Sequence, residues 1–219
     1  MIRKKLLKLI KLGFRENCIL CKQSAEGVVC NYCLSGLQKD INIQHQKLDF
    51  GLECDYYHLL NYSAEVRYLL QKLKFHKDLL VTQVFSKLII YWWDQVCGKY
   101  FVDVDAIAVV PIHRYRYLYR GFNQAEVLAQ KLAEYTDIAT TFESYSRIKY
   151  TKSQAKSSKQ KRAEQIKGVF HLDKPMKANH LLVFDDVLTT GSTMKEFIQT
   201  IVNDSNIEKI SVVTLVRPN

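Results

Sequence analysis

The residues best suited to chemistry stand near the end of the chain, in the segment LLVFDDVLTTGST at positions 181–193. Two adjacent carboxylates, Asp185 and Asp186, follow an apolar run and suit either paired sugar hydroxyls or the ligand shell of Mg²⁺. In the next turn, Gly191 lets backbone N–H groups point inward as an anion site, and the helix expected there adds unpaired donors. The alternative is a purely structural role, in which an acid ends the strand and a Ser or Thr caps the next helix. That role needs only one acid and one cap, whereas the segment has two acids and several hydroxyls. We expect a phosphate to be held by Thr189, Thr190, Gly191, Ser192 and Thr193.

A group of cations precedes this segment, in the sequence VVPIHRYRYLYRGFNQ from Val109 to Gln124. Guanidinium groups bind phosphate oxygens bidentately and stay charged, so arginines beside a phosphate turn are typical of a pyrophosphate clamp. We assign to this clamp Arg114, Arg116 and Arg120, with His113 as a pyrophosphate contact, a general acid or a structural residue. Gly121 would allow a tight turn, and Asn123 would cap the following helix. The interleaved aromatic residues either stack nucleobases or pack within the fold: Tyr115, Tyr117, Tyr119 and Phe122.

Four of the six cysteines form two CxxC pairs separated by eight residues. Two such turns can place four thiolates around one tetrahedral metal, so the spacing predicts a zinc site with the ligands Cys18, Cys21, Cys30 and Cys33. Four thiolates leave no open coordination position, which makes this zinc structural. A thioredoxin-like redox pair is the alternative, but neither CxxC follows a strand of a βαβ unit.

Hydrophobic patterning places these groups on alternating strands and helices. Apolar strands are expected at 105–111, 180–184 and 209–216, with further strand character at 56–62. Helices are expected at 64–74, 79–96, 122–135 and 192–202. This alternation predicts an α/β fold with a parallel sheet, helices on both faces and a ligand at the carboxyl ends of the strands. We divide the chain into a basic amphipathic helix at 1–15, a zinc-cluster module at 16–55 and an α/β domain at 56–219.

The chain has 219 residues and a formal net charge of +10, with cations concentrated in residues 1–15 and 147–167. Such blocks attract polyanions such as pyrophosphate, a nucleotide or a nucleic acid backbone, unless they serve only as a solvated surface. No signal-peptide pattern and no apolar run of membrane-spanning length is found, so we expect a cytoplasmic protein without stable membrane insertion. In the second block we predict DNA contacts at Lys152, Lys156, Lys159, Lys161 and Arg162.

The segment 181–193 resembles the 5-phosphoribosyl-1-pyrophosphate (PRPP) motif of the type I phosphoribosyltransferases: four apolar residues, two acids, two variable residues and a Thr/Gly-rich turn. The resemblance implies that Asp185 and Asp186 hold the ribose hydroxyls as the catalytic acids, that Thr189 to Thr193 hold the 5-phosphate, and that Mg²⁺ accompanies PRPP. The sequence departs from many purine-salvage members at Thr189, where those proteins often carry an aspartate that acts as a base. Base chemistry of that kind is therefore not expected.

Nearly the whole chain, apart from roughly residues 36–55, is similar to the ComF/GntX group, whose members join an N-terminal zinc cluster to a phosphoribosyltransferase domain. The similarity rests on the segment from Arg120 to Gln124 (RGFNQ), on Ser153-Gln154, Lys161-Arg162 and Gly168-Val169-Phe170, and on Lys72-Leu73-Lys74-Phe75. We add Lys74 to the pyrophosphate contacts. Membership would imply a role in natural transformation, the uptake of single-stranded DNA, with other competence proteins as partners.

Two functions are compatible with these motifs. One is a non-catalytic competence protein that binds PRPP and single-stranded DNA. The other is an active Mg²⁺-dependent phosphoribosyltransferase that transfers ribose 5-phosphate from PRPP to an unknown acceptor, mainly by electrostatic stabilisation of the departing pyrophosphate. A PRPP-responsive transcription regulator ranks last, because the sequence contains no helix-turn-helix pattern.

Overall fold

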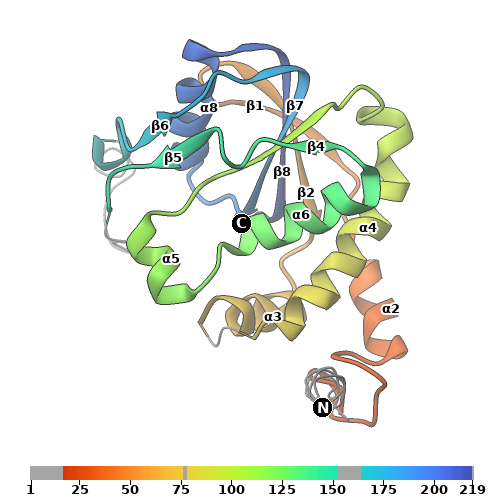
Figure 1. The fold of residues 1–219 in the computed structure, drawn as a ribbon. Helices are drawn as coiled ribbons and strands as arrows, with labels where there is room; N and C mark the ends of the chain where they lie inside the picture. The colour runs from red at the N-terminus through yellow and green to blue at the C-terminus, as the bar shows by residue number, and fades with distance from the viewer. Residues whose placement is uncertain (1–16, 76–77, 152–163, 219) are drawn as a thin grey trace, which may run out of the picture.

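The computed structural model describes residues 17–75, 78–151 and 164–218 and is built around a six-stranded sheet (Figure 1). The strand order is β1-β2-β8-β7-β3-β4, and every pairing is parallel except that between β1 and β2. The strands are β1 (His45–Asp49), β2 (Glu53–Leu60), β3 (Ala106–Val109), β4 (Ala139–Thr140), β7 (Lys177–Val187) and β8 (Asn206–Val216). A separate antiparallel pair consists of β5 (Tyr145–Arg147) and β6 (Phe170–Leu172). The predicted α/β fold is confirmed, with an antiparallel strand added at one edge.

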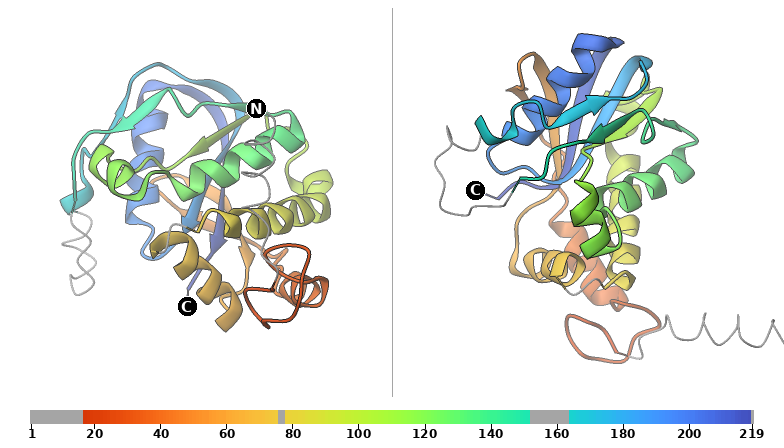
Figure 2. Two further views of the ribbon diagram at one scale, coloured as in Figure 1. Left: turned by 60° about the horizontal axis from the view of Figure 1, so that its bottom comes forward. Right: turned by 60° about the vertical axis from the view of Figure 1, so that its left-hand side comes forward.

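Helices cover both faces of the sheet, as Figure 2 shows: α8 lies on one side, and α4 and α6 lie on the other. The described helices are α2 (Asn31–Lys39), α3 (Ala64–Phe75), α4 (Leu80–Tyr100), α5 (Arg114–Arg120), α6 (Gln124–Thr136) and α8 (Ser192–Asp204). The four helices predicted within the α/β domain correspond to α3, α4, α6 and α8. Helix α5 was not predicted, because its RYRYLYR sequence has no apolar face and none of its residues is buried.

The central strand β7 shows how one apolar run supports both layers. Its side chains alternate, so Leu182 and Phe184 pack in the cluster with α4 and α6, whereas Leu181 and Val183 pack in the cluster with α8. All four are fully buried. Replacing such a residue by alanine typically costs about 2–5 kcal/mol of stability. This double anchoring fixes the strand end that carries the two acids.

A polar network centred on the buried His180 ties the far half of β7 to its neighbours. The His180 ring lies 2.8 Å from Asp103 Oδ1 through Nδ1 and 2.8 Å from Ser211 Oγ through Nε2. Asp103, His180 and Ser211 are linked in the same order as the Asp, His and Ser of a hydrolytic triad. However, His180 and Ser211 are each only 1% exposed. Burial lowers the pKa of His180 despite its carboxylate partner. The network therefore holds strands together and offers no nucleophile to a substrate.

The N-terminal cysteine module packs on the helical layer of the main domain. Its apolar side chains Ile19, Val28 and Leu37 join the cluster that contains α4. The predicted module boundary at 55/56 falls inside β2, because both β1 and β2 belong to the main sheet. The basic helix predicted at 1–15 lies outside the described residues. Within the described ranges, no helix has both the length and the apolarity needed to cross a bilayer.

Candidate functional site

A polar cavity opens at the carboxyl edge of the sheet, where the ends of β3 and β7 meet α3, α5, α6 and β5. The parallel register brings these strand ends together: Val109 pairs with Phe184, and Asp185 pairs with Thr214 of β8. Ligands of open parallel sheets sit at this edge. The side chains and loop residues that line the cavity include Lys74, Arg116, Arg120, Gln124, Arg147, Asp185, Asp186, Thr189, Thr190, Gly191 and Thr193.

The two acids enter this cavity from successive positions of β7. The Asp186 carboxylate forms a 2.8 Å ion pair with Lys74 of α3, and both side chains are largely buried. Asp185 Oδ1 accepts a 2.8 Å hydrogen bond from the Asp186 backbone N–H. Burial, followed by repulsion from Asp186, raises the pKa of Asp185 to about 7. The raised pKa means that the charged form of Asp185 is disfavoured in the free protein. A divalent cation or a pair of sugar hydroxyls next to Asp185 would stabilise that charged form, so the acids fit either partner.

The hydroxyl-rich turn forms the adjoining wall and leads into α8. Gly191 has φ of +74°, and a Cβ there would lie 3.4 Å from a ring carbon of Phe50, so a side chain at this position would be strained. The Thr190 and Ser192 hydroxyls lie 3.2 Å apart. Because the first N–H groups of a helix lack intrahelical acceptors, the start of α8 presents donors beside these hydroxyls. The arrangement suits a phosphate.

Arginines on α5 and β5 provide the positive wall of the cavity. Burial and then the charge of Arg120 lower the pKa of Arg116, while burial and then the charge of Arg116 lower that of Arg147 to about 10. These cations are thus partly desolvated and repel one another. An anion bound between them would remove this repulsion, which makes the wall complementary to a pyrophosphate.

Two donors in the cavity wall were missed by the sequence analysis. Gln124 is 1% exposed, and its Oε1 accepts a 3.2 Å hydrogen bond from Arg120. Among the described residues, neither Gln124 Nε2 nor Arg147 Nε has a hydrogen-bond partner, although both atoms are buried. Buried donors without acceptors are costly, so these two suggest a ligand oxygen. Only the tertiary structure shows that these two residues belong to the cavity. In the sequence, Arg147 lies in a separate hairpin, and Gln124 has the pattern of an ordinary residue in the first turn of a helix.

Some predicted site residues do not line the cavity. His113 is 6% exposed and caps α5, where its Nδ1 accepts from the Tyr115 N–H at 3.2 Å. The Arg114 guanidinium lies 5.8 Å from the Tyr115 ring centroid instead. Ser192 faces a neighbouring hollow on the other side of the turn. The predicted DNA contacts at 152–162 lie outside the described residues.

The two structural roles predicted around α5 are present. Gly121 ends the helix with φ of +87°, and the Asn123 side chain caps α6 by accepting from the Ala125 N–H.

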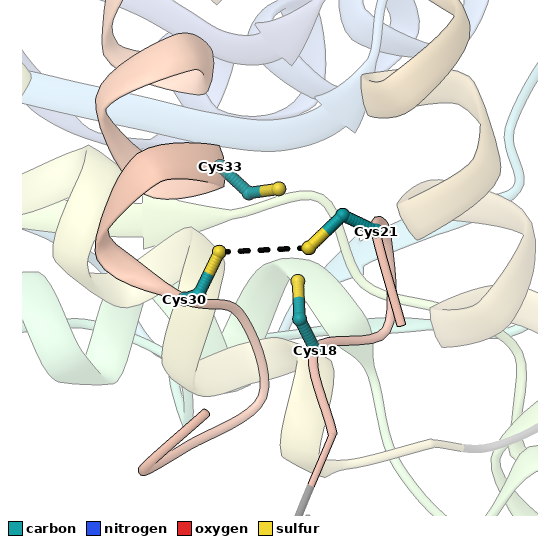
Figure 3. Close-up of side chains that lie close together, drawn as sticks. All are labelled: Cys18, Cys21, Cys30 and Cys33. Atoms are coloured by element: carbon teal, nitrogen blue, oxygen red, sulfur yellow. Dashed lines mark hydrogen bonds between the residues drawn. The ribbon is translucent and has the colours of Figure 1, made fainter. Parts of the chain in front are cut away.

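The four cysteines of the two CxxC pairs converge on one point, with their sulfur atoms turned toward a common centre (Figure 3). All four Sγ atoms lie within 4.8 Å of one another, and those of Cys21 and Cys30 are 3.7 Å apart. A tetrahedral zinc–thiolate site has sulfur–sulfur distances of roughly 3.8 Å, so the cluster fits zinc. Burial opposes ionisation of Cys18, but backbone hydrogen bonds outweigh it and lower its pKa to about 6. One thiolate is therefore favoured even before a metal binds.

Comparison with known proteins agrees with this arrangement. Residues 107–219, more than half of the chain, match the family model described as "Phosphoribosyl transferase domain". The chain is 27% identical to "Competence protein F" of Haemophilus influenzae, over 93% of its own length and 98% of that protein. The chain belongs to the ComF family. Another relative, "Competence protein ComFC" of Streptococcus pneumoniae, is 23% identical over 92% of this chain and 81% of that protein.

Other relatives match over shorter stretches. The "DNA utilization protein YhgH" of Salmonella typhi is 35% identical over 46% of this chain, and the match covers 44% of that protein. The protein of the same name from Escherichia coli K12 is 28% identical over 66% of this chain and 64% of that protein. The chain thus spans less than two thirds of these two proteins. The matched domain begins within β3, so Lys74 is supplied by a segment that precedes it.

Proposed function

We propose that this ComF-family protein binds PRPP in the cavity at the sheet edge and single-stranded DNA during DNA uptake. The observation that supports PRPP most directly is the meeting, in one cavity, of an acid pair, a hydroxyl-lined helix start and three arginines. These groups match the three parts of the ligand: ribose hydroxyls, 5-phosphate and pyrophosphate. A role that needed only a helix cap would not require the desolvated arginines in the same cavity.

Each wall of the cavity would bind a different part of PRPP. The turn from Thr189 to Thr193 would donate N–H and O–H groups to the 5-phosphate. Asp185 and Asp186 would accept hydrogen bonds from the ribose hydroxyls, and Lys74 would have to share Asp186 with them. Mg²⁺ would neutralise part of the pyrophosphate charge.

Calorimetry with Mg²⁺ and PRPP tests this assignment. The double variant Asp185→Asn with Asp186→Asn retains the shape of both side chains but removes both charges, and we expect it to lose measurable PRPP binding. The control is Asp173→Asn with Glu208→Gln, which changes the net charge equally at exposed positions away from the cavity. Wild-type affinity in the acid-pair variant would refute the site.

DNA binding is supported by the net charge of +10 and by relatives named for competence and DNA utilization. Binding through phosphates should weaken steeply with salt, with log K falling in proportion to log salt concentration. Fluorescence anisotropy of a labelled oligothymidylate at several salt concentrations measures this dependence. The absence of binding at low salt would remove DNA from the proposal.

The second candidate, an active phosphoribosyltransferase, is favoured by the arginine wall, since Arg116, Arg120 and Arg147 could stabilise departing pyrophosphate. Pyrophosphate release from PRPP, measured with a panel of nucleobases with and without single-stranded DNA, decides between the candidates. Release that depends on one acceptor supports the enzyme. Binding of PRPP without release supports the non-catalytic protein.

A further inference from the structure

We infer that His113, Tyr115 and Tyr150 form a stacking platform for unpaired bases of single-stranded DNA at the rim of the cavity. This inference rests on the proposed function, because it assumes that the protein binds DNA. It gives that binding a location among the described residues and a mode, ring stacking, that phosphate contacts alone do not provide.

The platform consists of three rings from two separate segments. The His113 ring centroid lies 5.1 Å from that of Tyr115 and 5.4 Å from that of Tyr150, and the two tyrosine rings are 6.1 Å apart in an edge-to-face arrangement. His113 is buried beneath them, whereas Tyr115 and Tyr150 are 60% and 49% exposed. Two large aromatic side chains therefore stand in solvent on a buried ring, with area left for a further ring to stack.

Hydrogen bonds fix the two segments relative to each other. Arg116, the residue after Tyr115, donates to the backbone carbonyl of Thr151, the residue after Tyr150, at 2.8 Å. Arg147 donates to the Thr151 hydroxyl at 2.7 Å. His113 is fixed in turn by its bond from the Tyr115 N–H. The rings are thus held in place before a ligand arrives, which reduces the entropy lost on stacking.

The charges around the platform select a polyanion. Arg114 precedes Tyr115 and Lys149 precedes Tyr150, so a cation flanks each exposed ring, and α5 (RYRYLYR) carries no acid. Alternating cations and aromatic rings are the pattern by which single strands are bound, because the backbone pairs with the cations while the bases stack. Figure 1 shows α5 at the periphery of the molecule, below β5.

The test compares an oligothymidylate of about 12 nucleotides with an oligomer of equal length in which several central bases are replaced by abasic sites. The wild-type protein should bind the base-containing strand about tenfold or more tightly. Tyr115→Ala with Tyr150→Ala should bind both strands equally, at the abasic level. Tyr115→Phe with Tyr150→Phe should retain the preference, because the rings remain. Tyr91→Ala, at a 39% exposed tyrosine on α4, is the matched control and should behave as wild type.

Two outcomes separate this inference from the proposed function. If wild type binds DNA but the double alanine variant keeps the full preference for bases, the platform is wrong while DNA binding stands. If wild type binds neither strand at low salt, the platform and the DNA-binding part of the proposed function are both wrong. Thermal melting and PRPP calorimetry establish whether the alanine variant is folded. Neither tyrosine lines the cavity, so a folded variant should bind PRPP as the wild type does.

Discussion

Replacing Asp185 by asparagine should stabilise the ligand-free protein while removing PRPP binding. The pKa of Asp185 is raised from an ordinary 3.8 to about 7, first by burial and then by Asp186. A shift of one pKa unit corresponds to 1.36 kcal/mol, so the charged carboxylate costs at most about 4 kcal/mol of folding free energy. Asparagine removes this charge, and its oxygen can still accept from the Asp186 N–H.

The pH dependence follows from the same shift. Between pH 4 and pH 7 the folded wild type retains a proton that the unfolded chain releases, so the wild type loses stability as pH rises through this window. The variant has no such group. Its advantage should therefore be near zero below pH 4, increase up to pH 7 and stay constant above it, at about 1–4 kcal/mol.

Urea unfolding followed by tryptophan fluorescence is a suitable assay, because Trp92 and Trp93 are buried in the core. Unfolding free energies would be compared at pH 4, 5, 6 and 8. Asp186→Asn is the contrasting variant, since it breaks the partly buried ion pair with Lys74 and should lose about 1–2 kcal/mol, between the values typical of exposed and of fully buried pairs. If Asp185→Asn is less stable than wild type at pH 8, or if its advantage does not change with pH, the described environment of Asp185 is wrong.

Three further predictions concern other parts of the molecule. Arg147→Gln should weaken PRPP binding about 10–100-fold by calorimetry, since it removes a charged donor beside Asp185; an unchanged affinity would exclude Arg147 from the site. Cys21→Ser should reduce zinc content below one ion per chain by mass spectrometry and lower the melting temperature, whereas a full zinc content would contradict the four-cysteine site. His180→Ala should cost about 2–4 kcal/mol in urea unfolding and leave PRPP affinity unchanged, because its network lies away from the cavity; loss of PRPP binding in a folded variant would contradict this separation.

Much of the fold could be predicted because many of its elements are determined by patterns within short, contiguous segments. The apolar run 180–184 and the hydroxyl turn after it are contiguous, so the strand, the acid pair and the start of α8 all follow from neighbouring residues. Strand β1 was missed because HQKLD has the polarity of a loop. Its extended conformation is stabilised by pairing with β2, which the local sequence does not indicate. Helix α5 was missed because His113 and Gly121, which cap it, give a weaker signal than an apolar face.

The site was predicted less completely than the fold. Thr189 to Thr193 and the acid pair lie in one motif, but the remaining lining of the cavity comes from β5, α5 and α6, whose approach is a property of the tertiary structure. Arg147 is one cation among many in a basic segment until the hairpin places it beside Asp185. Conversely, Arg114 fits the clamp by residue type, yet the helical turn directs it to Tyr115.

The central claim is that the acid pair and the hydroxyl turn hold one sugar phosphate. Its most direct test is a crystal structure of the protein with PRPP and Mg²⁺. We predict the 5-phosphate against the backbone N–H groups of Thr190 to Thr193, with the ribose hydroxyls within hydrogen-bond distance of Asp185 or Asp186. A ligand bound elsewhere, or a turn closed to phosphate while PRPP binds in solution, would contradict the account.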